Sequence, residues 1–555
     1  MARLESYDMD DLEEGVESPD KPPGPRHAHS RSHAWLPSHV VLTAVVLLAV
    51  LVGIFIRVWI LGNQPINSDE ATPGLMAHQI LRGHPSAFYW GQSYGSGEPY
   101  VVAALFAIAG QSPLTLNLTP AILAVAAALV VWRIGLRLFG APAAVAAATL
   151  SWVWGEATVW NSVREIGFRG VTLLCGLVVI LLAIRLHASI AEGRRAKLHW
   201  LALGLFAGLG WWASPEISYF IVPAALLLVI DLRRQPTREI LSAVGFSVGA
   251  FVVGALPWIV ATASGAGTFD QQPSPTGYLG RLQLLFTHAA PIALGVRVEG
   301  AGAWLWSAPF GVMVLIALAA ATVASAALLI SNVAARVLIY FVCAFPFIYA
   351  AFSATFFWND ARYVVYLTPI LALLWMGALW KTAGRHAEWF AAGVLIVALV
   401  ATLIAFNDGY GTFNSVSALT RWNANPNDAV TALGDRLESD GVRAVLAQYW
   451  LANTLTFVSD GKVVALDPDS TRNPPGELNQ LGAAERTWVF VNPEDTGASA
   501  AALGAPGALS PAGTTLAQLQ SWAQAHDVSL KTSAEGPFLV AQLTRSVSVN
   551  ELAAG

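Results

Sequence analysis

The fold is decided by an apolar run and the polar stretch directly after it: VVLTAVVLLAVLVGIFIRVWIL over residues 40–61, then NQPINSDEATPGLMAHQILRGHPSAFYWGQSYGSGEPY over residues 63–100. The apolar run has the length of about 20 residues that crosses a hydrocarbon core. It is too long for the core of a signal peptide and has no A-x-A-like site behind it, so we expect an uncleaved anchor. The polar stretch then places the adjacent acids Asp69 and Glu70 at the membrane surface.

The composition indicates a polytopic membrane protein. Of 555 residues, 55% are hydrophobic and only 12% are charged, and the mean hydropathy is +0.55. A chain this apolar is not an ordinary soluble protein. The net charge of -5 gives no basic face for nucleic acid, so membrane lipids and sugars are the expected partners. Cys175 and Cys343 lie inside apolar runs, where small hydrophobes are expected rather than a disulfide or a metal site.

Hydropathy predicts about eleven membrane spans followed by a different kind of domain. We expect residues 1–37 to be a disordered tail, 38–407 to be the membrane domain with its outer loop at 63–100, and 408–555 to be a small α/β domain. After the first run, the predicted spans are Leu114–Leu138, Ala141–Trp160, Phe168–Ile190, Leu198–Ala213, Ile217–Leu232, Ile240–Thr262, Ala303–Ile330, Val333–Phe356, Tyr363–Trp380 and Trp389–Phe406.

The charges of the connections predict the orientation. Basic residues fall on alternate connections, which the positive-inside rule places in the cytoplasm together with the N-terminal tail. The other connections hold acids, arginines and tryptophans and are expected to face outward. An odd number of spans then places everything after Phe406 outside a plasma membrane. The basic connections contain Arg133 and Arg137, then Arg185, Arg194, Arg195 and Lys197, then Arg233, Arg234 and Arg238, and then Lys381 and Arg385.

The C-terminal part has alternating helical and strand-like patterns, which are typical of an α/β domain. It contains no phosphate-binding glycine motif and no metal-ligand cluster, so we expect it to support the outer surface or to bind an acceptor. The predicted helices are Ala429–Ser439, Leu451–Val458 and Leu516–Ala525. The predicted strands are Val442–Ala447, Lys462–Ala465, Thr487–Val491 and Phe538–Leu543.

Asp69 has two interpretations from the local pattern. Pro73 and the apolar residues after it predict a short amphipathic helix that begins just behind the acidic pair and lies along the membrane. Asp69 then either caps this helix or acts as a general base on a substrate hydroxyl. Glu98 follows a glycine-rich bend and is either a second acid of the same site or a solvated interfacial side chain.

Arginines of the outer connections are candidates for holding an anionic group, because guanidinium binds phosphate bidentately. The alternative for at least half of them is an interfacial position in which the side chain reaches the lipid head groups. Arg362 is favoured, followed by Arg164. The other outer arginines are Arg169, Arg281 and Arg297, and further candidate binding residues are Tyr94, Glu165, Glu216 and Tyr363.

Four segments together resemble the GT-C superfamily of glycosyltransferases, most of all the branch of protein O-mannosyltransferases and lipid A aminoarabinose transferases, in its Ala/Gly-rich actinobacterial form. The resemblance covers about residues 40–406. In place of the lysine-proline segment of the aminoarabinose transferases, this chain has Gly97-Glu98-Pro99. The segments are INSDEATPGLMAHQIL (66–81), YWGQSYGSGEPY (89–100), WWASPEISYFIVPA (211–224) and ARYVVYLTPIL (361–371).

The resemblance implies inverting transfer of a sugar from a polyprenyl-phosphate donor to an outer hydroxyl on a glycan, lipid or protein, with or without a divalent metal. It casts Asp69 as the catalytic base, Glu70 as its neighbour and Arg362 as the arginine of the late RY segment. A transporter or flippase of a lipid-linked saccharide is the alternative, and a transporter should carry charges near the bilayer midplane. The central parts of the predicted spans are nearly free of ionisable groups, and the acids lie in loops at one face, which favours the enzyme over the transporter. A non-catalytic assembly scaffold is a third possibility.

Overall fold

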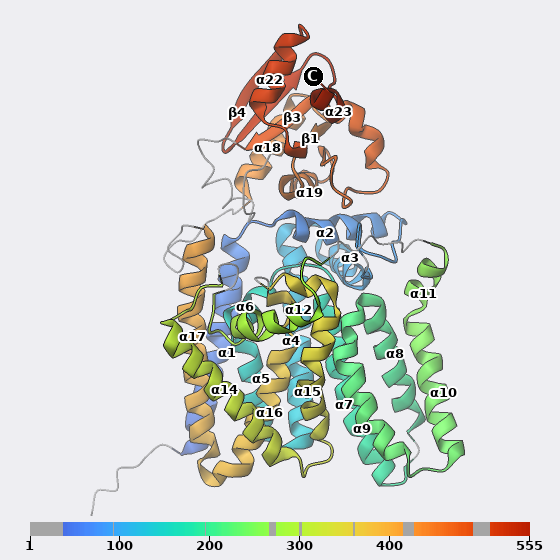
Figure 1. Cartoon of the computed structure of the whole chain (residues 1–555), viewed down its shortest axis with the longest axis vertical. Helices are drawn as coiled ribbons and strands as arrows, with labels where there is room; N and C mark the ends of the chain where they lie inside the picture. The colour runs from blue at the N-terminus through green and yellow to red at the C-terminus, as the bar shows by residue number, and fades with distance from the viewer. Residues whose placement is uncertain are drawn as a thin grey trace, which may run out of the picture. The chain divides into compact units, whose positions relative to one another are not determined.

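The computed structural model describes residues 37–92, 94–194, 196–265, 274–298, 302–358, 361–414, 427–491 and 511–554. The prediction of a disordered tail over 1–37 lies, apart from Pro37, outside these residues. From residue 38 to residue 414 the described chain is helical, and its long helices run side by side (Figure 1). The longest are α1 (Ser38–Asn63), α4 (Pro113–Leu138), α7 (Arg169–Ala191), α14 (Ala308–Leu329) and α17 (Ala387–Asn414).

Shorter helices complete the helical part. Helix α2 crosses the ends of the long helices on the side of the C-terminal domain, and α12 also runs across them (Figure 1). The remaining helices are α2 (Ser68–Leu81), α3 (Gly97–Ala109), α5 (Ala141–Val153), α6 (Glu156–Asn161), α8 (Lys197–Ala213), α9 (Ser218–Leu232), α10 (Thr237–Gly254), α11 (Leu256–Ala263), α12 (Tyr278–Leu284), α13 (Ala290–Ala293), α15 (Arg336–Ala351) and α16 (Leu367–Ala383).

Within the described ranges, seven helical segments are long and apolar enough to cross a membrane, and one of them, Leu367–Asn407, combines α16 and α17. Three shorter apolar helices accompany them: α3, α5 and α15. The predicted span over 141–160 is broken, because the chain turns at Gly155 with a φ of +87° between α5 and α6. The predicted span over 240–262 is likewise divided into α10 and α11, with Pro257 in the first turn of α11.

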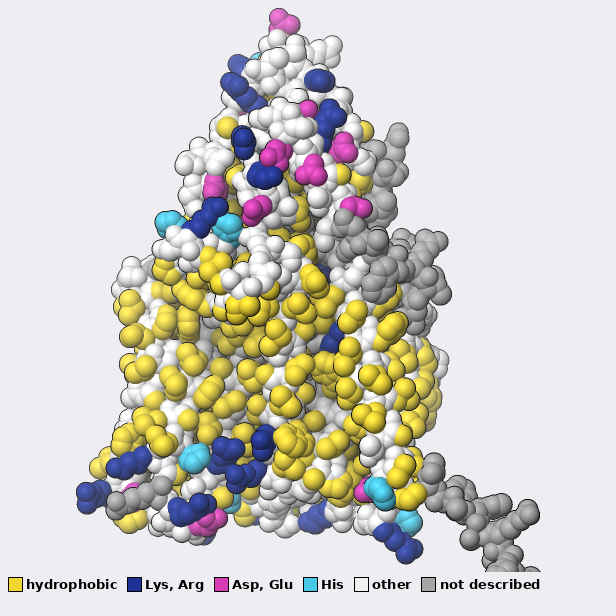
Figure 2. All heavy atoms as spheres, turned by 180° about the vertical axis from the view of Figure 1, so that it is seen from behind, with side chains coloured by type: hydrophobic (Ala, Val, Ile, Leu, Met, Phe, Trp, Pro, Cys, Tyr) yellow, Lys and Arg dark blue, Asp and Glu magenta, His cyan; other side chains and the backbone are white. Residues whose placement is uncertain are grey.

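The outer surface of the helical part is apolar over a broad belt, as expected for contact with lipid. Figure 2 shows this belt of hydrophobic side chains, with Lys and Arg side chains gathered at the end opposite the α/β domain. Leu51, Ile316 and Val397 are between 63% and 69% exposed. A belt of large exposed apolar side chains is unfavourable in water and is expected where the protein contacts lipid.

The C-terminal part forms a five-stranded sheet in the order β2-β1-β3-β5-β4. Strand β1 pairs in parallel with β2 and β3, whereas β5 is antiparallel to β3 and β4. Both faces of the sheet are buried: α18 and α19 cover one, α22 the other. The bounds are α18 (Asp428–Ser439), β1 (Ala444–Leu446), α19 (Tyr449–Val458), β2 (Val464–Leu466), α20 (Leu481–Ala484), β3 (Thr487–Val491), α22 (Leu516–Ala525), β4 (Leu530–Glu535), β5 (Phe538–Leu543) and α23 (Val549–Ala554).

Helix α2 packs closely against helix α19 of the α/β domain. A Cβ at Gly74 would lie 2.5 Å from the ring of Phe457, so only glycine permits this approach. The buried Asn453 donates from Nδ2 to Thr72 Oγ1 at 2.8 Å and to the carbonyl of Arg472 at 3.1 Å. The C-terminal domain is therefore joined to the outer loop by specific side-chain contacts.

Candidate active site

Helix α2 begins at Ser68, so both acids lie inside its first turn. The cap is Asn67, whose side chain accepts from the backbone N–H of Glu70, while the Glu70 side chain accepts from the backbone N–H of Asn67. This reciprocal capping box satisfies two backbone donors at the start of the helix. The prediction that the helix begins behind the acidic pair is thus wrong, and capping does not occupy the Asp69 carboxylate.

Among the described residues, three side chains surround the Asp69 carboxylate, and two of them come from the C-terminal domain. Tyr449, the first residue of α19, donates its hydroxyl to Oδ1 at 2.5 Å. Arg472, in the loop after β2, donates from Nη1 to the same oxygen at 2.5 Å and to the Tyr449 hydroxyl at 2.8 Å. Arg362 approaches from the membrane domain, with its Nη1 3.6 Å from Oδ2. The Asp69 side chain is 13% exposed, which leaves a narrow approach from outside.

This surrounding changes the proton affinity of Asp69. Burial by itself raises the pKa of the carboxyl, but Arg472, Arg362 and the Tyr449 hydrogen bond outweigh burial, and the net pKa lies below its usual value. Asp69 is therefore ionised at neutral pH. With both cations in place it is also a weaker base than an ordinary aspartate.

Aromatic side chains from the loop over residues 63–100 lie beside Asp69. Tyr89 donates its hydroxyl to the backbone carbonyl of Asp69 at 3.0 Å. The Tyr94 ring lies 4.0 Å from the Phe168 ring and 5.3 Å from the Tyr89 ring, measured between centroids. The predicted site residue Tyr94 thus belongs to an aromatic wall beside Asp69.

Glu70 points to a different, closed part of the molecule. Its carboxylate pairs with Arg164 and accepts from Asn117 Nδ2 at 2.9 Å. Glu70 is fully buried and Arg164 is 5% exposed, and Arg164 also donates to the carbonyl of Pro65 at 3.1 Å. Burial raises the pKa of Glu70, although Arg164 and Asn117 oppose this shift. Glu70 and Arg164 form a buried ion pair that ties the outer loop to the segment before α7.

Two acids, Glu98 and Glu165, lie buried next to each other. Glu98 accepts from the backbone N–H of Val171, in the first turn of α7, at 3.1 Å. Glu165 accepts from the backbone N–H of Gly167 at 3.1 Å, and its own N–H donates to Asn117 Oδ1 at 2.9 Å. Burial and then the charge of Glu98 raise the pKa of Glu165 well above its ordinary value.

Glu216, Arg169 and Tyr363 form a further cluster, and Tyr363 is the chain neighbour of Arg362. Tyr366 donates its hydroxyl to Glu216 Oε2 at 2.5 Å, and Arg169 Nη2 lies 3.9 Å from Glu216 Oε1. The guanidinium of Arg169 stacks on the Tyr363 ring at 4.6 Å. The cluster is balanced in charge and supports the segment that carries Arg362.

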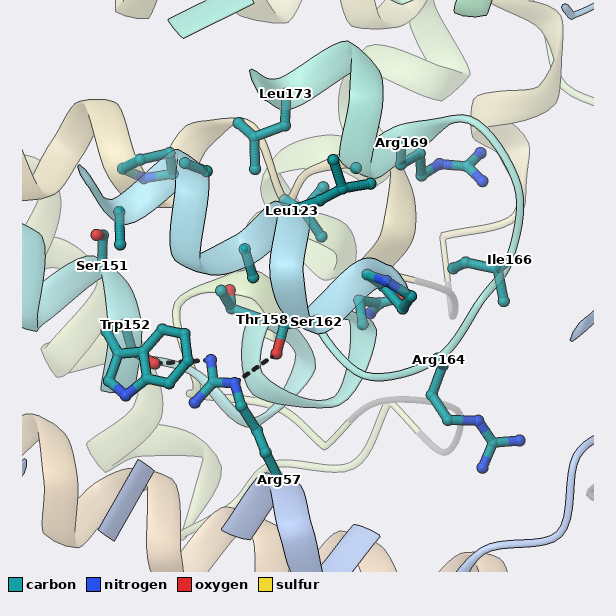
Figure 3. A pocket seen from close by; sticks show the side chains of 18 of the residues that line it. Arg57, Leu123, Ser151, Trp152, Thr158, Ser162, Arg164, Ile166, Arg169 and Leu173 are labelled. Atoms are coloured by element: carbon teal, nitrogen blue, oxygen red, sulfur yellow. Dashed lines mark hydrogen bonds between the residues drawn. The ribbon is translucent and has the colours of Figure 1, made fainter. Parts of the chain in front are cut away.

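A cavity of about 80 Å³ lies inside the membrane part, lined by apolar residues of α4 on one side and by residues 151–173 on another. Arg57 of α1 reaches its edge, stacks on Trp152 at 3.5 Å and donates to Ser162 Oγ at 2.8 Å (Figure 3). The side chains of Arg164 and Arg169 extend away from Arg57 (Figure 3). Arg57 is thus a buried basic side chain in the last two turns of α1, outside the central part of this helix.

Sequence reasoning missed Tyr449, Arg472 and Asn117. Asn117 had a usable signal, since a polar amide inside an apolar run is costly unless it binds something. Tyr449 and Arg472 had none, because they lie 380 and 403 residues from Asp69 and join it only through the tertiary fold. Two of the predicted arginines bind backbone carbonyls instead of an acid described above: Arg281 donates to the carbonyl of Ala350, and Arg297 donates to the carbonyl of Gly302.

Among the described residues, the groups beside the Asp69 carboxylate are guanidinium groups and phenol rings rather than oxygen anions, a set that does not suit a divalent cation. Across the ranges that the structure describes, no three His, Cys, Asp or Glu side chains gather into a possible metal site.

A family model matches part of the sequence. The model for dolichyl-phosphate-mannose-protein mannosyltransferase matches residues 97–259, from the start of α3 into α11. Among curated proteins, no relative matches the chain.

Solved structures match almost the whole chain. ArnT from Cupriavidus metallidurans in the apo state superposes with a TM-score of 0.56 at 12% identity, covering 90% of this chain and 98% of that one. The same protein bound to undecaprenyl phosphate gives 0.55 at 12% identity with the same coverage. AglB, an oligosaccharyltransferase from Archaeoglobus fulgidus, gives 0.46 at 13% identity, covering 92% of this chain and 75% of that one. The chain is a multi-pass membrane protein with the ArnT-like GT-C fold, which confirms the predicted fold class but not the predicted count of about eleven spans.

Proposed function

We propose that the protein is a membrane glycosyltransferase that moves a sugar from a polyprenyl-phosphate donor to a hydroxyl outside the cytoplasm. The carrying observation is the meeting of Asp69 with Arg362 on the side of the α/β domain. The family match to mannosyltransferases that use dolichyl phosphate and the fold of ArnT, which has been seen with undecaprenyl phosphate, support this class of donor.

In this proposal Asp69 is the general base. An acceptor hydroxyl binds at the Asp69 carboxylate and passes its proton to it as the hydroxyl oxygen forms a bond to the anomeric carbon. The bond from that carbon to the phosphate oxygen breaks, and polyprenyl phosphate leaves with the electron pair. One-step attack from the opposite face inverts the anomeric centre.

Arg362 holds the donor phosphate, because it is a partly exposed cation next to the base. Its side chain is 26% exposed, whereas Arg164 is buried against Glu70. We therefore assign Arg164 and Glu70 to positioning the outer loop. Tyr94 and Tyr363 are the proposed aromatic contacts for the sugar, and Glu98, Glu165 and Glu216 support the walls of the site.

The proposal includes a topology. Lys and Arg gather at the end remote from the α/β domain, which the positive-inside rule places in the cytoplasm (Figure 2). Residues 1–37 are then a cytoplasmic tail, 38–407 the membrane domain, and 408–555 an extracytoplasmic domain beside the outer loop. The actinobacterial-type branch is part of the same proposal.

The direct test offers the purified protein, in lipid nanodiscs, a panel of radiolabelled polyprenyl-phosphate sugars together with membrane extract. We expect one label to move onto an acceptor with the wild type and none with Asp69→Asn. Transfer by Asp69→Asn at the wild-type rate would exclude Asp69 as the base. Movement of intact labelled lipid across a vesicle membrane, without a new glycosidic bond, would instead identify a transporter.

A further inference from the structure

Three arginines lie near one another at the end of the helical part where Lys and Arg side chains gather, opposite the α/β domain (Figure 2). Arg133 and Arg137 are one turn apart near the C-terminal end of α4, and both are exposed. Arg185 is half-buried in the last two turns of α7, which packs against α4. The charges of Arg137 and then Arg133 act on the Arg185 guanidinium. We refer to these three residues as the arginine cluster.

No acid in the described part of the chain neutralises the arginine cluster. None of its three guanidinium groups forms an ion pair with a described carboxylate, and Arg185 Nε is buried without a hydrogen-bond partner. Two acids at the same end of the helices have partners of their own. Asp231 Oδ2 lies 2.8 Å from His187 Nδ1, and Glu192 pairs with Arg194. Like charges held together in this way are stabilised by an anion from outside the described chain.

The turns of α4 that precede the arginine cluster present apolar side chains to the surroundings. Val125 and Leu129 precede Arg133 and Arg137 at intervals of four residues, the spacing at which side chains of successive turns are neighbours. Val125 is 46% exposed and Leu129 is 57% exposed. An apolar stripe therefore leads along the helix to a group of cations. This arrangement matches a lipid, whose acyl chain contacts the stripe while its phosphate lies at the arginines.

We propose that the arginine cluster is a binding site for an anionic phospholipid of the membrane leaflet remote from the α/β domain. Guanidinium groups bind phosphate oxygens bidentately, and basic pockets between membrane helices bind anionic headgroups. Arg137 of α4 and Arg185 of α7 approach the headgroup from two helices, so the bound lipid joins these helices. Since one phosphate does not balance three cations, a headgroup with two phosphates binds more tightly than a headgroup with one. The site is independent of the proposed sugar transfer.

The direct test measures lipid binding to the full-length protein in a neutral detergent by native mass spectrometry. The probes are phosphatidylcholine, phosphatidylglycerol and diphosphatidylglycerol, which carry no net charge, one negative charge and two negative charges. The wild type should bind diphosphatidylglycerol about tenfold more tightly than phosphatidylcholine, with phosphatidylglycerol between them. The double variant Arg137→Gln/Arg185→Gln should lose this preference. Equal binding of the three lipids by the wild type would overturn the proposal.

The matched control removes two other positive charges from the same end of the helices. Arg233 and Arg234 follow α9 directly and are exposed. The double variant Arg233→Gln/Arg234→Gln should keep the preference for diphosphatidylglycerol, because it leaves the arginine cluster intact. If both double variants lost the preference equally, the attraction would belong to the basic surface as a whole, and the proposed site would be refuted.

Thermal unfolding separates a lipid site from a purely structural role. In neutral detergent, Arg137→Gln/Arg185→Gln removes charges that repel each other, so its melting temperature should be no lower than that of the wild type. Diphosphatidylglycerol should raise the melting temperature of the wild type and leave that of the variant unchanged, because a ligand stabilises only the protein that binds it. An equal rise in both proteins would overturn the proposal. Arg137→Lys/Arg185→Lys, which should keep part of the preference, replaces the glutamine variant if that variant does not fold.

The competing occupant is the acidic stretch over residues 8–14, which lies outside the described residues. Its five acids are Asp8, Asp10, Asp11, Glu13 and Glu14. Replacement of all five by the corresponding amides should leave the preference for diphosphatidylglycerol unchanged. If the preference were absent in the wild type and appeared only in this variant, the acidic stretch would be the occupant of the arginine cluster, and the lipid site would be refuted.

Discussion

Asp69 and Glu70 are neighbours in the chain and yet face two different regions of the molecule. Asp69 meets two partly exposed arginines and a tyrosine at the boundary with the C-terminal domain. Glu70 is fully buried and is held by Arg164, Asn117 and the helix cap. Successive residues of a helix point about 100° apart, so one acidic dipeptide at a helix start can serve two regions. The first region is partly open to its surroundings, whereas the second is closed.

The strongest test of this comparison is activity. Asp69→Asn should lower the transfer rate about 10³-fold, within the range of a lost general base, and leave thermal unfolding close to that of the wild type. Initial rates with saturating donor and acceptor measure the effect. Substitution of the neighbour, Glu70→Gln, is the matched control, and folded Glu70→Gln protein should retain most of its activity. Equal losses per folded molecule would remove the distinction between the two acids.

Stability should show the opposite pattern. Glu70→Gln leaves the buried Arg164 without a carboxylate, which should destabilise the protein by about 3–5 kcal/mol. The apparent melting temperature in detergent should fall accordingly, and far less for Asp69→Asn. The double variant Glu70→Gln/Arg164→Met removes both charges and should regain part of the loss. A Glu70→Gln variant that melts with the wild type would show that the pair does not hold the loop.

Substitution of Arg362 should weaken donor binding, whereas substitution of Arg281 should not. Arg362→Ala should raise the donor KM about tenfold, the effect of about 1.4 kcal/mol, and leave the acceptor KM near its wild-type value. Steady-state kinetics with each substrate varied in turn measures this. Arg281→Ala is the control, because Arg281 contacts backbone carbonyls away from the acids. An unchanged donor KM in Arg362→Ala would remove Arg362 from the phosphate site.

The smallest effect is expected at the helix cap that both regions share. Asn67→Ala removes the side-chain acceptor for the Glu70 N–H and should cost about 1 kcal/mol in the free energy of unfolding. Asn67→Ser retains a capping oxygen and should lose less. If Asn67→Ala instead lowered the transfer rate as strongly as Asp69→Asn, the position of the first turn would itself limit catalysis.

The sequence predicted those parts of the fold that depend on local pattern. Hydropathy located α4 and α7 to within one residue, and strand periodicity located β3 and β5 with their observed bounds. Strand β4 was missed, because its sequence LKTSAE is polar and its side chains are largely exposed at the sheet edge. Helix α3 was missed because 13 residues are too few for a full span.

The candidate site was predictable only in part. Asp69 and Arg362 were expected from the residues and from the resemblance to GT-C enzymes, and the structure brings them together. The pairing of Glu70 with Arg164 was not expected, since nothing local links residues 94 positions apart. The contacts of the C-terminal domain with Asp69 could not be predicted for the same reason. The composition of this domain indicated only a supporting or acceptor-binding role.

The close packing of α2 against α19 has a consequence for biosynthesis. The partners of Asp69 in the C-terminal domain are encoded 380 and 403 residues downstream, so the ribosome adds them after all the membrane helices. When the last residue of α17 has just been added, Tyr449 and Arg472 are still to be synthesised. The centre is therefore assembled only after synthesis is nearly complete, and truncated products that stop after α17 lack two of the groups that surround the carboxylate.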